Sequence, residues 1–204
     1  MKTNIAIFAS GRGSNFLAIA KAIKSGKLRK ANLAFLLCDN PDAPVINKAK
    51  KLKIKVVLIK PEAHTVKEDF ENKVIRYLRE NKIELIVLAG FMRILSRKFV
   101  SAYRNKIINI HPSLLPAFKG KEGIKDAYEY GVKVTGVTVH FVDEKMDHGP
   151  IIMQREVRIE GRDTLPSLEN KIHKIEHQLY PKAIELLIDN KLRLKGRRIL
   201  VKNQ

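Results

Sequence analysis

Short apolar segments alternate along the chain with segments in which apolar residues recur every three or four positions. The first kind of segment predicts buried β-strands, and the second predicts amphipathic helices. The predicted strands are residues 4–10, 32–39, 55–59, 83–89, 106–111, 135–142 and 150–158. The predicted helices are residues 16–25, 44–52, 67–81 and 96–104, together with a long helix that contains Leu168, Ile172, Ile175 and Leu179 and bends at Pro181.

The order of these elements predicts the fold class. Strands that alternate with helices are typical of parallel βαβ units. No helix separates residues 135–142 from residues 150–158, so we expect these two strands to pair antiparallel. The sequence therefore predicts an α/β fold with a doubly wound, mostly parallel, Rossmann-like sheet and an antiparallel C-terminal edge. Neither a linker nor an internal repeat interrupts the pattern, which predicts a single domain over residues 1–204.

The charge balance is strongly basic, with 40 Lys and Arg against 21 Asp and Glu and a net charge of +19. The basic residues are spread from Lys2 to Lys202, and aromatic residues make up 6% of the chain with no Trp. The chain therefore has few aromatic side chains on which nucleic-acid bases could stack. We favour a solvated basic surface that attracts anionic small molecules over a surface that binds nucleic acid. Residues 191–202 alternate basic and apolar side chains, which predicts an edge strand guarded by Lys and Arg.

Cysteine content and hydrophobic run length predict the compartment. Cys38 is the single cysteine, which excludes a disulfide framework and a multi-cysteine zinc site. No apolar run is long enough to span a membrane, and residues 1–10 lack the features of a signal peptide. We expect a cytoplasmic protein that does not bind membranes.

A glycine turn follows the first predicted strand. Residues 10–15 read Ser-Gly-Arg-Gly-Ser-Asn and lead into a helix, where backbone N–H groups favour an anion. No Gly-Lys-Ser/Thr follows, and Phe16 replaces the third glycine of a dinucleotide fingerprint. A single monophosphate is the expected ligand, although a capping turn without a ligand explains the same residues equally well.

Two polar residues lie two positions apart at the end of a predicted strand. Asn109 and His111 therefore share one face, at the carboxyl end where sheets of this type bind ligands. The amide can donate to a developing oxyanion, and the imidazole can transfer a proton. The alternative is that both side chains are satisfied by nearby backbone groups.

A polar loop at residues 143–150 supplies a carboxylate, which beside His111 would favour the imidazolium. Residues alone do not decide which acid meets His111, and we interpret His140 as a hydrogen-bonded core histidine. Residues 173–177 match the H-x-x-E-H metal pattern, but few further carboxylates remain to complete a site, so we predict no metal.

Four motifs, in this order and spacing, resemble the phosphoribosylglycinamide formyltransferases of purine biosynthesis. They are residues 10–15, residues 88–95 (Leu-Ala-Gly-Phe-Met-Arg-Ile-Leu), residues 109–116 (Asn-Ile-His-Pro-Ser-Leu-Leu-Pro) and residues 147–150 (Asp-His-Gly-Pro). The resemblance extends from Met1 to about Lys191. It implies transfer of a formyl group from 10-formyltetrahydrofolate to the amine of glycinamide ribonucleotide.

The resemblance also implies which residues form the site. The implied catalytic residues are Asn109, His111 and Asp147. The implied ribonucleotide contacts are Gly13, Ser14, Asn15, His173 and Glu176, although many relatives carry glutamine at the position of His173. The implied folate contacts are Lys67, Met92, Arg93, Ile94, Leu95, Val142, Asp143 and Glu144.

Three alternatives stay open beside this interpretation. A methionyl-tRNA formyltransferase would suit the positive charge, but we expect a further C-terminal domain there. A formyltetrahydrofolate hydrolase would be expected to carry an N-terminal regulatory domain. A non-enzymatic nucleotide-binding module would need the glycine turn but not Asn109 and His111. We expect small-molecule partners only, and either a monomer or a homodimer.

Overall fold

The computed structural model describes residues 1–60 and 67–202, except for the side chain of Lys67. The chain divides into two compact units, Met1–Ile108 and Asn109–Gln204. Strand β5 (Ile107–His111) crosses the boundary between them, so that its last three residues open the second unit. The expectation of a single domain stays a prediction.

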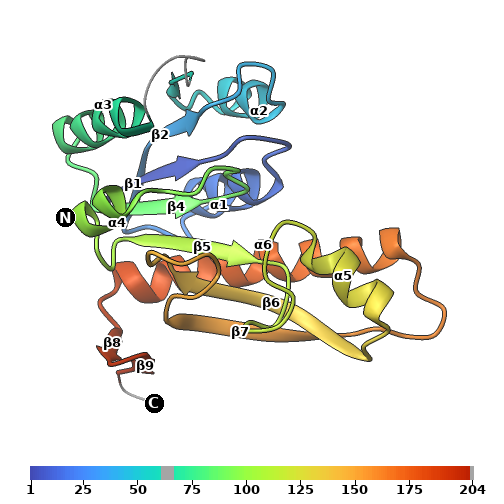
Figure 1. Cartoon of the computed structure of the whole chain (residues 1–204). Helices are drawn as coiled ribbons and strands as arrows, with labels where there is room; N and C mark the ends of the chain where they lie inside the picture. Colours follow the sequence, from blue (N-terminus) through green and yellow to red (C-terminus); the bar gives the residue numbers. More distant parts are fainter. Residues whose placement is uncertain (61–66, 203–204) are drawn as a thin grey trace. The chain divides into compact units, whose positions relative to one another are not determined.

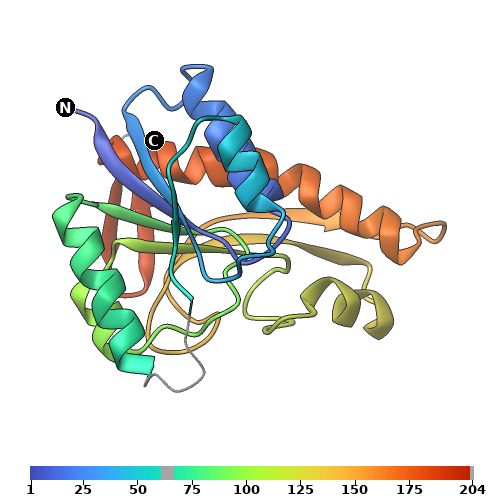
Figure 2. The ribbon, with the colours of Figure 1, turned by 90° about the horizontal axis from the view of Figure 1, so that it is seen from above.

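The first unit is a parallel sheet covered by helices on both faces. Its strands are β1 (Thr3–Phe8), β2 (Ala31–Cys38), β3 (Val56–Leu58), β4 (Leu85–Leu88) and the start of β5, in the order β3-β2-β1-β4-β5. Strand β1 pairs parallel with β2 and β4, and β2 pairs parallel with β3. Figure 2 shows α1 (Ser14–Lys24) and α2 (Val45–Lys51) together on one side of the strands, with α3 (Lys67–Glu80) and α4 (Arg97–Ala102) on the other.

Because both faces are covered, the strands of this unit are continuously apolar rather than alternating. All four residues of β4 are buried, as are Ile5–Phe8 in β1. Cys38 ends β2 within this core, and its thiol donates to the carbonyl oxygen of Asn40 at 3.1 Å. Burial raises the pKa of the Cys38 thiol.

The second unit combines an antiparallel pair of strands with a long helix. Strands β6 (Val134–Phe141) and β7 (Ile151–Arg158) pair antiparallel, as predicted, and β6 lies between β7 and the end of β5. Helix α6 (Leu165–Ile188) packs against β6 and β7, and α5 (Gly123–Tyr130) packs against α6 (Figure 1). Helix α5 has no counterpart among the predicted elements.

The N-terminus of α6 is fixed by polar side chains. Thr164 caps the helix through a reciprocal capping box with Ser167. The ammonium of Lys171 lies 2.6 Å from Asp163 and lowers the pKa of that carboxyl to about 2. The helix then continues through Pro181 to Ile188.

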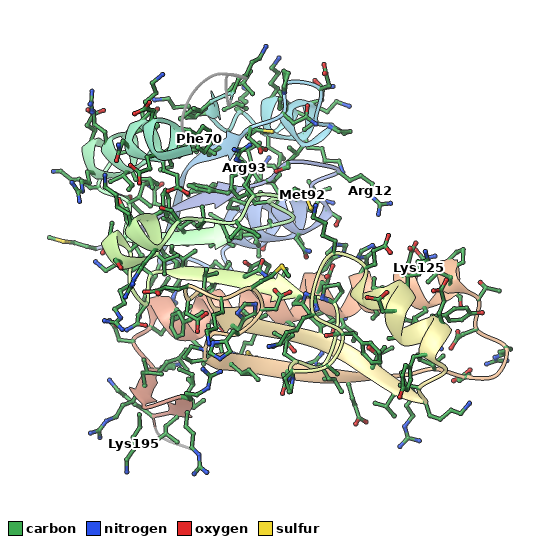
Figure 3. All side chains as sticks on the ribbon, viewed as in Figure 1. Arg12, Phe70, Met92, Arg93, Lys125 and Lys195 are labelled. Carbon is green, nitrogen blue, oxygen red and sulfur yellow. The ribbon has the colours of Figure 1, made fainter. Side chains whose placement is uncertain are left out.

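The C-terminal segment differs from the expected single edge strand. It forms a separate two-stranded antiparallel sheet of β8 (Leu192–Lys195) and β9 (Arg198–Val201). The prediction was wrong because Gly196, with φ of 60°, reverses the chain. Glycine at the first central position is typical of a two-residue hairpin turn of type II′. Figure 3 shows Lys195 on this hairpin, extending into solvent.

No helix in the described part of the chain combines the length and apolar character needed to cross a membrane.

Candidate active site

His111, at the end of β5, is held from both sides of its ring. Its Nε2 donates to the carbonyl oxygen of Phe118 at 2.7 Å, and its Nδ1 lies 3.5 Å from Oδ2 of Asp147. The histidine is 3% exposed, so these contacts define its surroundings. The 3.5 Å separation is longer than a typical direct hydrogen bond.

Gly123 explains how the ring fits beneath α5. A Cβ at this position would lie 3.1 Å from Nε2 of His111 and 2.8 Å from the carbonyl oxygen of Phe118. Helix α5 therefore begins with glycine where the ring and its acceptor occupy the available space. The helix and the loop before it fix Nε2 as a donor.

Asp147 lies on the loop between β6 and β7 in a strained backbone conformation. Its φ is 48°, in the left-handed region that aspartate tolerates better than most residues. Its Oδ2 accepts from the backbone N–H of Gly120 at 2.9 Å. A Cβ on Gly149 would overlap the carbonyl oxygen of Phe141, so the loop packs tightly against the end of β6. The position of the carboxylate is determined by this packing.

His140 joins the same cluster. Its Nδ1 donates to the carbonyl oxygen of Phe141 at 2.7 Å, and its Nε2 lies 3.3 Å from the amide nitrogen of Asn109. Nε2 also lies 3.8 Å from Oδ1 of Asp147. Burial lowers the pKa of His140, which favours the neutral ring. Neutral Nε2 accepts from Asn109 and so orients its amide.

Sequence reasoning interpreted His140 as a core histidine and missed its contact with Asn109. The available signal was its position at the end of a strand directly before the Asp147 loop. The described residues thus bring together the three side chains predicted to be catalytic, with His140 as a fourth member.

The lowered pKa of His140 leads to a prediction about acid stability. Between the ordinary histidine pKa of 6.5 and the lower value in the folded protein, the unfolded chain binds a proton that the folded chain does not. His140 therefore stabilises the protein fully above pH 6.5, and this contribution is lost progressively as the pH falls below that value. The free energy of unfolding, measured with urea, should decrease less between pH 7.5 and pH 5.5 for His140→Leu than for the unchanged protein. Equal decreases in both would contradict a neutral buried His140.

The glycine turn of the first unit is fixed by α2. Gly13 has φ of 69° and precedes the first residue of α1, and a Cβ there would overlap the side chain of Val45. The backbone N–H of Val45 donates to the carbonyl of Gly11 at 3.2 Å, and Lys48 donates to the carbonyl of Arg12 at 2.7 Å. Ser14 is half-buried and Asn15 is buried at the start of α1. The packing against Val45 and the positive φ thus both favour glycine at position 13.

The Gly13 packing gives a second prediction. Gly13→Ala should lower the free energy of unfolding by about 2–4 kcal/mol, from the left-handed backbone and from the overlap with Val45. Introduced into a Val45→Gly protein, which lacks both the Cγ2 and the Cβ that a Cβ at position 13 would overlap, the same change should cost only the backbone part, about 1–2 kcal/mol. Equilibrium urea unfolding of the four proteins measures both values. An identical cost in the two backgrounds would contradict the overlap.

The loop after β4 carries four of the predicted folate contacts. Its backbone is anchored at two points: the N–H of Met92 donates to Oγ of Ser10 at 3.0 Å, and the N–H of Ser96 donates to the buried Glu71 at 2.7 Å. The hydroxyl of Ser96 also bonds Glu71. The loop is therefore held in place by its backbone.

The side chains of this loop divide into two groups. Met92 and Ile94 are 62% and 64% exposed. The guanidinium of Arg93 lies 5.0 Å from the ring centre of Phe70, and Leu95 is buried. Figure 3 labels Arg93 and Phe70. The side chain of Lys67 lies outside the described residues.

The remaining predicted folate contacts lie in the second unit. Val142 and Asp143 are half-buried and Glu144 is exposed. Asp143 accepts from Nδ1 of His148 at 2.7 Å and from the N–H of Lys145 at 3.0 Å. These bonds shape the start of the loop that carries Asp147.

The two residues predicted to contact the ribonucleotide on α6 bond each other. Nδ1 of His173 lies 2.9 Å from Oε2 of Glu176, which is buried, and the ring of His177 stacks on that of His173. Burial, together with the charge of Glu176, raises the pKa of Tyr180 well above its ordinary value. Among the described residues, no group of three His, Cys, Asp or Glu side chains is arranged to hold a metal ion.

Comparisons with known proteins agree with this geometry. The family model for formyl transferases matches residues 3–184. The chain is 48% identical over 183 residues to a phosphoribosylglycinamide formyltransferase from Bacillus subtilis (strain 168), covering 90% of this chain and 93% of that protein.

Solved structures give the same result. Glycinamide ribonucleotide transformylase 1 from Symbiobacterium toebii superposes with a TM-score of 0.95 at 36% identity, covering 99% of this chain and 95% of that one. The corresponding enzyme from Geobacillus kaustophilus gives a TM-score of 0.89 at 46% identity, covering 92% and 100%. The predicted α/β fold class is confirmed. The chain belongs to the formyl transferase family, among the phosphoribosylglycinamide formyltransferases.

Proposed function

We propose that this protein transfers a formyl group from 10-formyltetrahydrofolate to the amine of glycinamide ribonucleotide in purine biosynthesis. The observation that carries the proposal is the convergence of Asn109, His111 and Asp147, with His140, at the end of β5. An amide donor, an imidazole and a carboxylate are the groups that direct acyl transfer to an amine requires. The names of the relatives support the same reaction.

The reaction begins when the uncharged amine of the ribonucleotide attacks the formyl carbon. A C–N bond forms, and negative charge develops on the formyl oxygen. The amide of Asn109 and the Nδ1–H of His111, whose Nε2–H stays bonded to the carbonyl of Phe118, donate to this oxygen, so the transition state meets donors that are already oriented. The substrate amine is itself the nucleophile, so no acyl-enzyme forms.

The second half of the reaction breaks the bond between the formyl carbon and N10 of the folate. The proton lost by the attacking nitrogen passes to the Asp147 carboxylate, directly or through water, and one proton is delivered to N10 as tetrahydrofolate leaves. Holding two substrates in attacking geometry supplies much of the acceleration. The rigid contacts around His111 and Asp147 serve this purpose.

Substrate binding is assigned to loops and helix residues described above. We assign the phosphate to the turn containing Gly13, Ser14 and Asn15, where the first turn of α1 supplies backbone donors. We assign Glu176, which is bonded to His173, to the glycinamide or ribose end of the substrate. The exposed side chains of Met92 and Ile94 in the first unit offer apolar surface for the pterin.

The net charge and the family match support proposals about the substrates, the domain organisation and the partners of the protein. A net charge of +19 favours substrates that carry phosphate and carboxylate groups. The family model spans residues of both compact units, which supports one functional domain. We propose a cytoplasmic enzyme with small-molecule partners, as a monomer or homodimer.

A formyl-transfer assay with three acceptors tests the proposal. The purified protein is given 10-formyltetrahydrofolate with glycinamide ribonucleotide, with charged initiator tRNA, or with water alone. We expect formylated ribonucleotide only. Formylation of the tRNA alone, or release of formate without an acceptor, would overturn the proposal in favour of the related formyl-folate enzymes.

A further inference from the structure

The C-terminal hairpin contacts the loop that carries Asp147. Arg197 occupies the second position of the turn between β8 and β9. Its Nη2 donates to the carbonyl oxygen of His148, and its Nη1 lies 3.5 and 3.4 Å from Nδ1 and Nε2 of the His148 ring. One guanidinium therefore contacts both the backbone and the side chain of the residue that follows Asp147.

His148 passes this constraint to the start of the loop. Its Nδ1 bonds Oδ2 of Asp143 at 2.7 Å, so Arg197, His148 and Asp143 form a continuous chain of contacts. The segment between Asp143 and His148 is closed at both ends by this chain. Asp147 lies within that closed segment.

The conformation of Asp147 explains why such a constraint matters. Its φ of 48° is strained for any residue with a side chain, and such conformations persist only where the surroundings determine them. The contact from Gly120 holds its carboxylate, and the packing of Gly149 limits the following turn. The contacts from Arg197 fix the peptide group of His148, which lies between these two points.

We propose that Arg197 is a positioning residue for formyl transfer, which holds the loop so that the Asp147 carboxylate stays directed at His111. This inference rests on the proposed function of Asp147. The family model matches residues 3–184, and the hairpin that carries Arg197 follows this segment. The proposed role of Arg197 therefore lies outside the matched segment. Lysine cannot reproduce both contacts, because only the planar guanidinium presents several donors in a fixed fork.

The experiment compares Arg197→Ala and Arg197→Lys with Arg193→Ala, which removes the same charge from an exposed position of the same hairpin. We expect Arg197→Ala to lower kcat about 10- to 100-fold with KM for the ribonucleotide and the unfolding midpoint unchanged. Arg197→Lys should recover part of the loss, and Arg193→Ala should behave like the unchanged protein. In an Asp147→Asn background, Arg197→Ala should cause no further loss, because the group that it positions is already gone.

Hydrogen exchange at residues 145–149 gives a readout that does not depend on activity. We expect faster exchange there in Arg197→Ala than in Arg193→Ala. Unchanged exchange would overturn the proposed contact, and faster exchange with an unchanged kcat would overturn the positioning role. If the unchanged protein formylates no ribonucleotide, the proposed function fails, whereas the exchange result still reports on the loop.

Discussion

Asp147→Asn is expected to lower kcat for formyl transfer by about 10²–10⁴-fold, the range of a lost acid–base group. Asparagine tolerates the positive φ at this position, and its side-chain oxygen can still accept from Gly120, so the loop should keep its shape. The amide cannot take up the proton that the attacking amine loses. Steady-state kinetics measure the loss, and calorimetry should show an unchanged Kd for the ribonucleotide.

Two comparisons make this result specific. Glu129→Gln neutralises an exposed carboxylate on α5 and should leave kcat unchanged. His111→Gln combined with Asp147→Asn should be about as slow as the slower single variant, because groups that act as one unit lose their contribution together. Turnover like that of the unchanged protein in both single variants would remove the pair from the mechanism.

Asn109→Ala is expected to lower kcat by about 10²–10³-fold, as for the loss of one oxyanion donor. The amide acts on charge that develops in the transition state, so KM for both substrates should change little. His140→Leu, which removes the acceptor that orients the amide, should give a smaller loss. Initial-rate kinetics on both variants provide the measurement.

The double variant Asn109→Ala with His140→Leu tests whether His140 acts through Asn109. If it does, His140→Leu should cost much less in an Asn109→Ala background than in the unchanged protein. Multiplicative losses would show that His140 acts independently of Asn109. A large rise in KM with constant kcat in Asn109→Ala would contradict the assignment of its amide to the oxyanion.

The regular elements of the fold could be predicted because buried strands and amphipathic helices leave periodic patterns. The strand predicted at residues 32–39 is Ala31–Cys38, and the helix predicted at 67–81 is Lys67–Glu80. Helix α5 could not be predicted in this way, because it begins at a glycine placed by packing against His111. The hairpin was missed because its alternation of basic and apolar residues continues across Gly196.

The site was predictable only in part, for a similar reason. Asn109 and His111 share a strand, so their common face follows from local geometry. The contact between Asn109 and His140 depends on how two different strands lie side by side, and sequence spacing carries no record of that. The contact between Arg197 and His148 joins residues 49 positions apart and has no local signature at all.

The thiol of Cys38 has a practical consequence. It is wholly enclosed at the end of β2, its S–H is engaged by Asn40, and burial disfavours the reactive thiolate. Alkylating reagents and mild oxidants should therefore leave the native enzyme unmodified, and the protein should keep its activity without added reductant. The same cysteine becomes a built-in reporter, because its labelling rate measures how often the first unit opens.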